Sequence, residues 1–502
     1  MLGPEDVYRL DINSRWLGIP TEFLMENAGK DVAEVVLGLY PKSMNVVCIC
    51  SRTNNGGDGL VAARHLSARK NVTVVFVGRP ELIRTEETRT NWEIINGLFF
   101  VEKVFVKTEE NLKKLEKALS DADVVIDAIF GIGIRGTPRG LEAKVIRKIN
   151  ELKQKNGFKV VSIDVPSGFD CFRGEPTDIM VDSDVIVTFH DTKKGLDKLG
   201  KKVIVRDIGI PKDAELFVGP GDMLKFLKER DPWSHKGNFG RILIVGGSDR
   251  YTGAPALSAL SALRTGADLA IIFAPSKISQ TLRSFSPNLI VWEYEGDVFN
   301  EKAVPILVEL VKNNKFDVLI IGPGIGSAKE TIDAVHMALR ELSGQIPIII
   351  DADAFKSLSK YGIPRGDIII TPHAGEFKLI FGCTPSSDIK ERGNLVREYA
   401  KKHGITILLK GHIDVISNGT HVKFNRTGNP GMTVGGTGDV LTGIVAAIRS
   451  VNNDSFRSAS IGAFLCGFAG DLAYKNYGYE LVATDVVNSI PEALKYLREF
   501  VK

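Results

Sequence analysis

The sequence predicts an α/β protein of two domains, each built on a parallel β-sheet covered by helices on both faces. Along both halves, short apolar runs alternate with segments of helical spacing, the pattern of buried parallel strands joined by crossover helices. The alternation lapses between residues 211 and 238, in a stretch rich in Pro, Gly and charge, and then restarts. The length of 502 residues leaves room for two or three domains at roughly 150 residues each. We therefore expect one domain over residues 1–212 and another over residues 222–502.

The first domain is expected to begin with helices, over residues up to about 40, that pack on its sheet. A polar, Gly-rich loop follows the first strand and leads into a segment of helical spacing at residues 60–70. Cys48 and Cys50 fall on one face of that first strand, which favours two buried core thiols over a metal site. Strands are expected at residues 44–50, 71–78, 123–131, 159–168, 184–190 and 201–211.

The second domain repeats the alternation, although the two halves show no sequence repeat. An apolar run enters a glycine turn at residues 241–247 and is followed by an amphipathic helix at 254–266. An Asn-Gly pair at 418–419 predicts a hairpin within residues 405–425. Further strands are expected at residues 268–275, 316–326, 346–355 and 366–377. Because ligands of open α/β sheets bind at the carboxyl ends of strands, the residues that follow these strands are the candidates for function.

Composition and charge limit the function classes. Hydrophobic residues make up 44% and charged residues 25% of the chain, an ordinary soluble composition, and the net charge of +3 predicts neither a nucleic-acid nor a membrane partner. Five scattered cysteines form no disulfide framework, so a reducing compartment fits. The N-terminus does not resemble a signal peptide, and no apolar run reaches the ~18 residues that span a bilayer. We expect a cytoplasmic protein and, since two-domain α/β enzymes often assemble symmetrically, a homo-oligomer.

The glycine-rich stretch GGTGD, residues 435–439, directly precedes a helical pattern. Backbone N–H groups of such a turn and the positive end of the helix can hold a phosphate. Asp439 would then lie beside the transferred phosphoryl group, where it could accept a proton from an attacking hydroxyl. The alternative is a plain turn in which Asp439 caps the helix. These five residues alone leave both interpretations open.

Six segments of the second half together resemble the ribokinase-like superfamily and, within it, the ADP/ATP-dependent NAD(P)H-hydrate dehydratases. The resemblance covers nearly all of residues 225–500. A GxGD turn alone would indicate only a small-molecule kinase, and the further motifs make the resemblance specific. The segments are GGSDRYTGAPALSA (246–259), IGPGIG (321–326), DADA (351–354), TPHAGEF (371–377), LLKGHID (408–414) and VGGTGDVLTG (434–443).

This resemblance implies a ribokinase-like α/β domain that phosphorylates the hydroxyl of a hydrated nicotinamide ring and so turns it into a good leaving group. Asp439 would act as the catalytic base at that hydroxyl. ADP, or else ATP, would be the phosphoryl donor, with Mg²⁺ on the nucleotide. The nucleotide-binding residues implied are Lys410, Gly411, His412, Ile413, Asp414, Thr437 and Gly438. The residues implied for the hydrated dinucleotide are Ala254, Gly326, His373 and Asp439.

Three strand ends of the first half carry polar groups: TNNGGDG at residues 53–59, Asp127, and Asp164 together with Ser167. The first is not the G-x-G-x-x-G fingerprint, but it offers flexible backbone amides at a helix N-terminus. A single aspartate after a strand is more often a loop acceptor. Three such clusters in one domain favour a common site.

NNGGDG (54–59), DAIFGIGIRG (127–136), DVPSG (164–168) and FHDTKKG (189–195) together resemble the NAD(P)H-hydrate epimerase domain, across residues 1–212. The resemblance implies a Rossmann-like three-layer sandwich that interconverts the R and S hydrates at ring carbon 6. The residues implied for the hydrated dinucleotide are Asn54, Asn55, Gly56, Gly57, Asp58, Gly131, Ile132, Gly133, Ile134, Arg135, Gly136, Thr137 and Asp164. The implied potassium ligands are Asn55, Asp127 and Ser167.

Epimerisation needs a carboxylate that moves a proton, for which Asp127 is the candidate and Asp164 the alternative. Lys193 either faces this site or is solvated. Together the two domains would repair both epimers of hydrated NADH or NADPH. Two alternatives stay open: a second domain that makes a stable phosphate ester of some other alcohol, and a first domain that binds a dinucleotide without catalysis.

Overall fold

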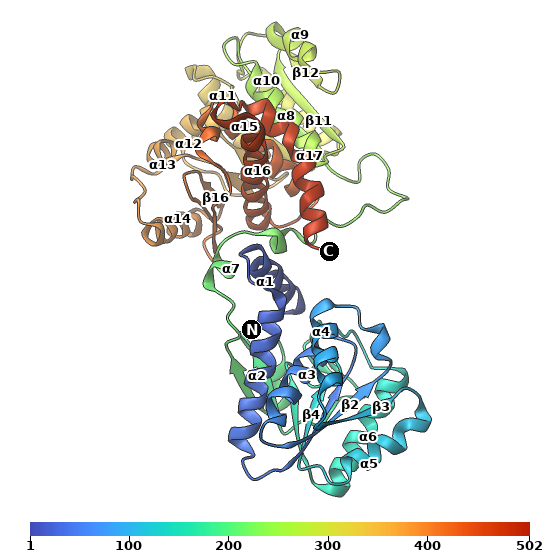
Figure 1. Cartoon of the computed structure of the whole chain (residues 1–502). Coiled ribbons are helices and arrows are strands. Elements are labelled where there is room, and N and C mark those ends of the chain that lie inside the picture. Colours follow the sequence, from blue (N-terminus) through green and yellow to red (C-terminus); the bar gives the residue numbers. More distant parts are fainter. The chain divides into compact units, whose positions relative to one another are not determined.

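A computed structural model describes all residues 1–502 of the chain, which divides into two units (Figure 1). Seven parallel strands form the main sheet of the first unit, Met1–Ala214. The strand order is β3-β2-β1-β4-β5-β8-β9, and every neighbouring pair is parallel. The strands are β1 Asn45–Cys50, β2 Asn71–Val77, β3 Val101–Val106, β4 Val124–Ala128, β5 Lys159–Ile163, β8 Val185–Phe189 and β9 Lys202–Arg206, with a separate pair β6 Phe169–Asp170 and β7 Glu175–Pro176.

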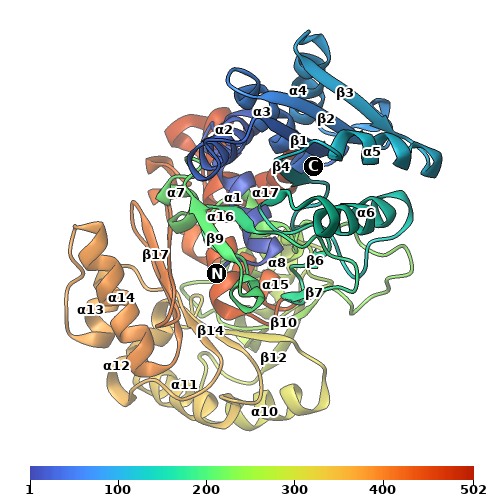
Figure 2. The same cartoon turned by 90° about the horizontal axis from the view of Figure 1, so that it is seen from below.

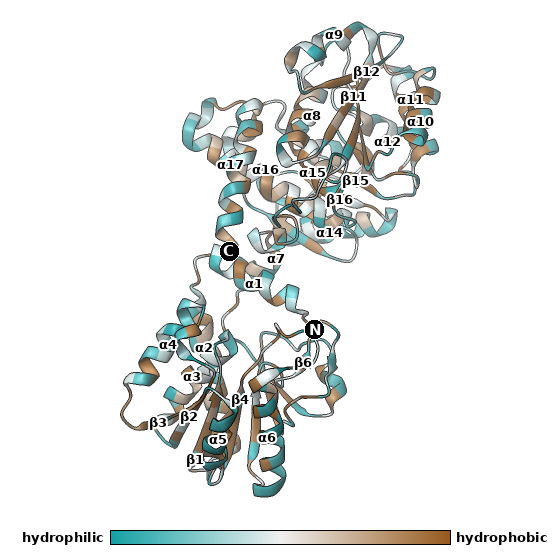
Figure 3. Cartoon of the chain, turned by 90° about the vertical axis from the view of Figure 1, so that its right-hand side faces the viewer, coloured by the Kyte–Doolittle hydropathy of each residue, from teal (hydrophilic) through white to brown (hydrophobic).

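Helices cover both faces of this sheet, so the predicted three-layer sandwich is confirmed. Side chains alternate along β1: Val46, Cys48 and Cys50 pack on one face, and Val47 and Ile49 on the other. Both cysteines are fully buried free thiols, as expected for core residues. The first face packs on α1 Pro4–Trp16, α2 Thr21–Leu39, α3 Asn54–Ser67 and α4 Glu86–Gly97, and the second on α5 Leu112–Leu119 and α6 Gly140–Asn156. Figure 3 shows the strands as hydrophobic and the outer surfaces of α5 and α6 as hydrophilic.

In the first unit, the order in which the strands are added to the sheet changes direction between β1 and β4. The chain runs outward from β1 through β2 to β3 and then returns to β4, on the other side of β1. Loops that leave β1 and β4 therefore turn in opposite directions and open a crevice at the carboxyl end of the sheet, where ligands of such folds bind. The NNGGDG and DAIFGIGIRG motifs follow these two strands.

A nine-stranded sheet forms the centre of the second unit, Glu215–Lys502, in the order β12-β11-β10-β13-β14-β15-β16-β17-β18. It is parallel up to β16, after which β17 and β18 form an antiparallel hairpin whose turn contains the predicted Asn418–Gly419 pair. Gly419 adopts φ +89°, which glycine reaches without steric cost. The strands are β10 Arg241–Val245, β11 Leu269–Pro275, β12 Ile290–Tyr294, β13 Val318–Ile321, β14 Ile348–Ile350, β15 Ile368–Ile370, β16 Thr406–Leu409, β17 Asp414–Ser417 and β18 Val422–Asn425.

The second sheet is also covered on both faces, and a second switch of strand order lies between β10 and β13. One layer holds α8 Gly253–Thr265, α15 Thr437–Arg449, α16 Ser455–Tyr477 and α17 Ala483–Phe500. The opposite side holds α10 Ala303–Asn313, α11 Lys329–Leu342, α12 Phe355–Tyr361, α13 Ala374–Phe381 and α14 Ile389–His403 (Figure 2). α9 Ser276–Phe285 packs on β12, and α7 Lys212–Leu216 spans the boundary between the units. No helix is both long and apolar enough to cross a membrane.

Candidate active sites

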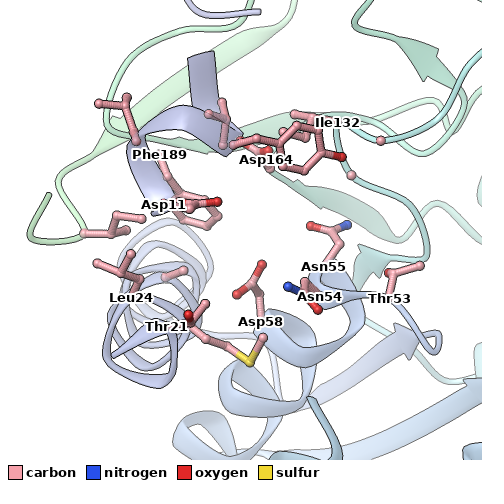
Figure 4. Close-up of a pocket in the computed structure, with 18 of the residues that line it drawn as sticks. Asp11, Thr21, Leu24, Thr53, Asn54, Asn55, Asp58, Ile132, Asp164 and Phe189 are labelled. Carbon is pink, nitrogen blue, oxygen red and sulfur yellow. The ribbon is translucent and has the colours of Figure 1, made fainter. Parts of the chain in front are cut away.

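A cavity of about 830 Å³ opens in the first unit at the switch point of its sheet. Its walls come from α1, from the start of α2 and α3, and from the segments that follow β1, β4, β5 and β8 (Figure 4). Most of the residues predicted for this domain are brought together here. Those that line the cavity are Asn54, Asn55, Asp58, Gly131, Ile132, Gly133, Ile134, Arg135 and Asp164.

The two adjacent glycines of NNGGDG do not line the cavity. A Cβ on Gly56 would overlap the backbone carbonyl of Ser51, and one on Gly57 would lie 2.6 Å from the end of the Met25 side chain. These glycines let the first turn of α3 pack against β1 and α2, a packing requirement that accounts for both glycines without a ligand.

Gly136 and Thr137 also lie outside the cavity lining. The amide of Gly136 donates a 2.8 Å hydrogen bond to the Asp170 carboxylate. That bond anchors the end of the 131–137 loop, whose first five residues face the cavity.

Asp164 and Lys193 form an ion pair at the cavity. Lys193 Nζ lies 2.8 Å from Asp164 Oδ1, and its side chain is only 2% exposed, so it is not solvated. The ammonium also donates to Thr188 Oγ1 and to the carbonyl of Phe189, and the Thr188 hydroxyl donates to Asp164. Asp164 holds φ +64°, an unusual backbone conformation for a residue other than glycine. This network fixes the carboxylate at the carboxyl end of β5.

Asp127 is fully buried and is not among the residues that line the cavity. Its carboxylate accepts hydrogen bonds from the hydroxyl of Ser162, from both the hydroxyl and the amide of Ser167, and from the amide of Ile129. Burial raises the pKa of Asp127, although these donors oppose the shift. With both oxygens occupied and no opening to the cavity, Asp127 is poorly placed to touch a substrate directly.

The potassium ligands predicted from the sequence lie close to one another. Ser167 Oγ is hydrogen-bonded to Asp127 and lies 3.3 Å from the carbonyl oxygen of Phe130. Asn55 packs on Gly131 in the same loop, and its side-chain Nδ2 is buried without a hydrogen-bond partner. An unpaired buried N–H indicates a missing hydrogen-bond acceptor rather than a cation, so only the side-chain oxygens of Asn55, Asp127 and Ser167 suit potassium. No three His, Cys, Asp or Glu side chains of the chain form a group suited to a metal.

Two polar residues of α1 that line the cavity, Tyr8 and Asp11, were not predicted from the sequence. Burial, and next to it the charge of Asp164, raises the pKa of Asp11 to about 7, while Lys193 opposes the shift. In the sequence Asp11 is one acidic residue of a mostly polar helix. Its position depends on how α1 packs on the sheet, which no local pattern reveals.

Asp439 lies in the first turn of α15, on the glycine-rich turn predicted to hold a phosphate. Gly436 is the N-cap of this helix with φ +96°, and a Cβ there would lie 2.7 Å from Leu257. The Asp439 carboxylate accepts no hydrogen bond from this turn, so the helix-cap interpretation is wrong. Burial, followed by the charge of Asp351, raises the pKa of Asp439 to about 7, and Lys410 opposes the shift.

Lys410 and Asp351 form the charged neighbourhood of Asp439. Lys410 Nζ lies 3.1 Å from Asp351 Oδ1 and 3.9 Å from Glu376 Oε2. Asp351 is only 2% exposed, and its other oxygen accepts a 2.9 Å hydrogen bond from Thr442 of α15. Burial would lower the pKa of Lys410, but the carboxylates of Asp351 and Glu376 outweigh it and raise the pKa. The DADA segment was quoted for its resemblance, but Asp351 was not predicted as a site residue.

The other predicted nucleotide residues lie around this cluster. A Cβ on Gly438 would be 3.3 Å from Lys410 Nζ, which places the ammonium beside the glycine turn. The amide of Gly411 donates to half-buried Asp414, while Gly411 and His412 are exposed, and Ile413 lies in the same turn. The Thr437 hydroxyl donates to carbonyls of its own turn.

Ala254, Gly326 and His373, predicted to hold the dinucleotide, follow three strands of the second sheet. Ala254 lies in the first turn of α8, which follows β10, and Gly326, at φ +90°, lies in the loop after β13. His373 follows β15 and is the N-cap of α13, where its Nδ1 accepts from the amides of Gly375 and Glu376. This bond leaves Nε2 as the protonated ring nitrogen of a neutral His373, on a side chain that is 60% exposed.

Comparisons with known proteins agree with the motifs. Residues 242–492 match the family described as NAD(P)H-hydrate dehydratase, and residues 21–195 match the family described as YjeF-related protein N-terminus. The bifunctional NAD(P)H-hydrate repair enzyme of Pyrobaculum aerophilum is 42% identical over 98% of this chain and 97% of its own length. The enzyme of the same name from Methanothermobacter thermautotrophicus is 40% identical over 98% of this chain and 95% of its own.

Among solved structures, the ADP/ATP-dependent NAD(P)H-hydrate dehydratase from Bacillus subtilis, co-crystallised with ATP/Mg²⁺, superposes with a TM-score of 0.50 at 28% identity. It covers 56% of this chain and 98% of its own. The ribokinase-like prediction for the second unit is thereby confirmed. The chain belongs to the family of bifunctional NAD(P)H-hydrate repair enzymes, with an epimerase unit followed by a dehydratase unit.

Proposed function

We propose that the second unit dehydrates the S epimer of hydrated NADH or NADPH at the expense of ADP, releasing AMP and phosphate. The first unit interconverts the R and S epimers at ring carbon 6, so that all of the damaged cofactor can be recovered. The observation that carries the proposal is the Asp439 carboxylate, which makes no hydrogen bond within its own glycine turn and lies beside the Lys410–Asp351 pair. That arrangement suits phosphoryl transfer to a hydroxyl.

In the second unit, Asp439 takes the proton of the ring hydroxyl as that oxygen attacks the terminal phosphoryl group. The N-terminus of α15 and the Lys410 ammonium face the negative charge of the phosphoryl oxygens. The phosphorylated hydroxyl is then a good leaving group, and the lone pair of the ring nitrogen expels it. Loss of a proton from ring carbon 5 restores the reduced nicotinamide.

Mg²⁺ on the nucleotide fits the oxygen donors of this site. Glu376 and Asp351 offer carboxylate oxygens within 3.9 Å of Lys410 Nζ, and Mg²⁺ prefers carboxylates together with phosphate oxygens and water. Bound there, the ion would neutralise charge on the phosphates. ADP and ATP could each supply the phosphoryl group, and we propose that ADP does so.

In the first unit, the cavity at the switch point holds the hydrated dinucleotide. Asn54 and Asn55 lie at the positive end of the α3 dipole, which suits a phosphate, and residues 131–135 form the facing wall. Of the two carboxylates offered by the sequence, Asp164 lines the cavity and Asp127 does not. We therefore assign the contact with the reacting ring to Asp164, and a potassium ion to Asp127, Ser167 and Asn55. That ion would fix the loops after β4 and β5.

The proposal can be tested with the pure protein and acid-hydrated NADH, which contains both epimers, together with Mg²⁺, K⁺ and ADP. Full return of the reduced-nicotinamide absorbance, matched by AMP and phosphate, is the expected result. Recovery of only part of the mixture would remove the epimerase assignment and leave a first unit that only binds. No recovery with ADP or ATP would reject dehydration and favour a kinase that makes a stable phosphate ester.

Replacing Asp351 by Asn should shift the pH dependence of dehydration and slow it. The charge of Asp351 raises the pKa of Asp439 to about 7, whereas the charge of Lys410 lowers it. Without the Asp351 charge, the pKa of Asp439 should fall, and the acid limb of the pH–rate profile should move to lower pH. Lys410 also loses its charge-assisted hydrogen bond, which we expect to lower kcat by about ten- to a hundred-fold. Rates measured from pH 5 to 9 would check both effects. Asp353→Asn is the matched control, because Asp353 pairs with Lys356 instead, and an unshifted profile in Asp351→Asn would contradict the coupling.

A further inference from the structure

Three carboxylates surround the cavity of the first unit, and they differ in their partners. Asp164 is held by the Lys193 ammonium at 2.8 Å and by the Thr188 hydroxyl at 2.9 Å. Asp11, from α1, and Asp58, from the first turns of α3, make no hydrogen bond or ion pair within the protein. Figure 4 shows Asp58 on the opposite side of the cavity from Asp11 and Asp164, with all three turned toward its centre.

The proposed epimerisation sets a requirement that two such groups can meet. Inversion at ring carbon 6 can proceed by loss of the hydroxyl from one face and entry of water on the other. One group must give a proton to the departing oxygen, and another must take a proton from the entering water. These two groups have to lie on opposite sides of the ring, and at neutral pH one must carry its proton while the other is ionised.

We propose that Asp11 is a catalytic residue of the epimerisation, acting as the base on one face of the ring while Asp58 acts as the acid on the other. This inference rests on the function proposed for the first unit. It assigns proton transfer to a residue of α1, outside every motif of the sequence.

The step balances as follows. The bond between ring carbon 6 and its oxygen breaks, and the oxygen takes the proton of Asp58 and leaves as water. The lone pair of the ring nitrogen forms a double bond to carbon 6. A water molecule then bonds to the opposite face of carbon 6, the π electrons return to nitrogen, and Asp11 takes the proton of that water. The reverse reaction uses the same two groups with their roles exchanged.

The charges around the cavity support this division of roles. Burial, and next to it the charge of Asp164, raises the pKa of Asp58 well above its usual range, which favours the protonated form of this group. The pKa of Asp11, raised to about 7 by the same two causes, leaves it partly ionised there; Glu87 adds to the shift and Lys193 opposes it. Two carboxyl groups whose environments separate their pKa values form an acid and base pair. Asp164, tied to Lys193, supplies a fixed negative charge near the ring nitrogen as that nitrogen becomes positive.

The test is Asp11→Asn, with R-to-S interconversion followed chromatographically in the absence of nucleotide. We expect kcat of epimerisation to fall by about a hundred- to ten-thousand-fold. Binding of the hydrated dinucleotide, measured by calorimetry, should stay within a few-fold of the wild type. The acid limb near pH 7 in the wild-type rate should be absent from the residual activity of the variant. Asp11→Glu, which keeps the acid group, should recover part of the rate.

Two controls separate a chemical role from a structural one. Asp6→Asn changes a carboxylate of the same helix that does not line the cavity, and it should epimerise at the wild-type rate. Dehydration of pure S hydrate by the second unit should be unchanged in all variants. Wild-type epimerisation by Asp11→Asn, or a loss of binding that matches the loss of rate, would overturn the role of Asp11 alone. A wild-type protein that does not epimerise would overturn the proposed function of the first unit itself.

Discussion

Asp439→Asn should abolish most of the dehydration and leave epimerisation intact. The amide cannot take the proton of the ring hydroxyl, so we expect kcat to fall by about a hundred- to ten-thousand-fold. Because the proton moves only in the transition state, KM should change little. The helix should be preserved, since the Asp439 carboxylate makes no capping bond and the N-cap is Gly436.

The wild-type pH dependence gives a second measure of the same role. Asp439, with its pKa raised to about 7, is mostly protonated below that pH and cannot act as a base. Dehydration of pure S hydrate should therefore fall as the pH drops through about 7, and this limb should disappear from the residual rate of Asp439→Asn. Asp297→Asn, at an exposed carboxylate, is the control. Near-normal dehydration by Asp439→Asn would show that another group takes the proton.

The interior of both sheets could be predicted because its strands are buried on both faces and read as uninterrupted apolar runs. The edge strands β3 and β12 lacked that signal. Their sequences, VEKVFV and IVWEY, mix charged and apolar residues because one side of each strand has no neighbour. The hairpin of β17 and β18 was predictable from Asn-Gly chemistry alone.

In the candidate sites, only the residues that belong to recognisable sequence motifs could be predicted. GGTGD and KGHID placed Asp439 and Lys410 in one site, and their proximity is confirmed. Asp11 and Asp351 carry no motif of their own that marks them as reactive, because their importance comes from packing and from the charges that surround them. The adjacent glycines of NNGGDG are required by close packing of α3, and a packing requirement and a ligand contact look alike in sequence.

Asp127→Asn should remove epimerisation while dehydration continues. The amide can still accept from the fixed amide of Ser167, but its NH₂ group then faces the Ser167 hydroxyl, and the charge that would hold potassium is lost. We expect the first unit to lose about 1–3 kcal/mol of stability, the cost of a disturbed buried hydrogen bond. Asp123→Asn is the matched control. Asp123 also accepts from two backbone amides, but at the amino end of β4, far from the cavity, so its loss should cost stability without stopping epimerisation.

The potassium dependence of Asp127→Asn separates the two roles open to this carboxylate. If Asp127 holds the cation, the variant keeps its proton-transfer groups and binds potassium weakly, so high KCl should restore part of the epimerisation. If Asp127 itself moves the proton, no salt concentration can replace it, and NaCl and KCl should act alike. Its four hydrogen bonds and its absence from the cavity wall favour rescue by potassium. Loss of activity without rescue, in a variant whose first unit still melts cooperatively, would return the catalytic role to Asp127.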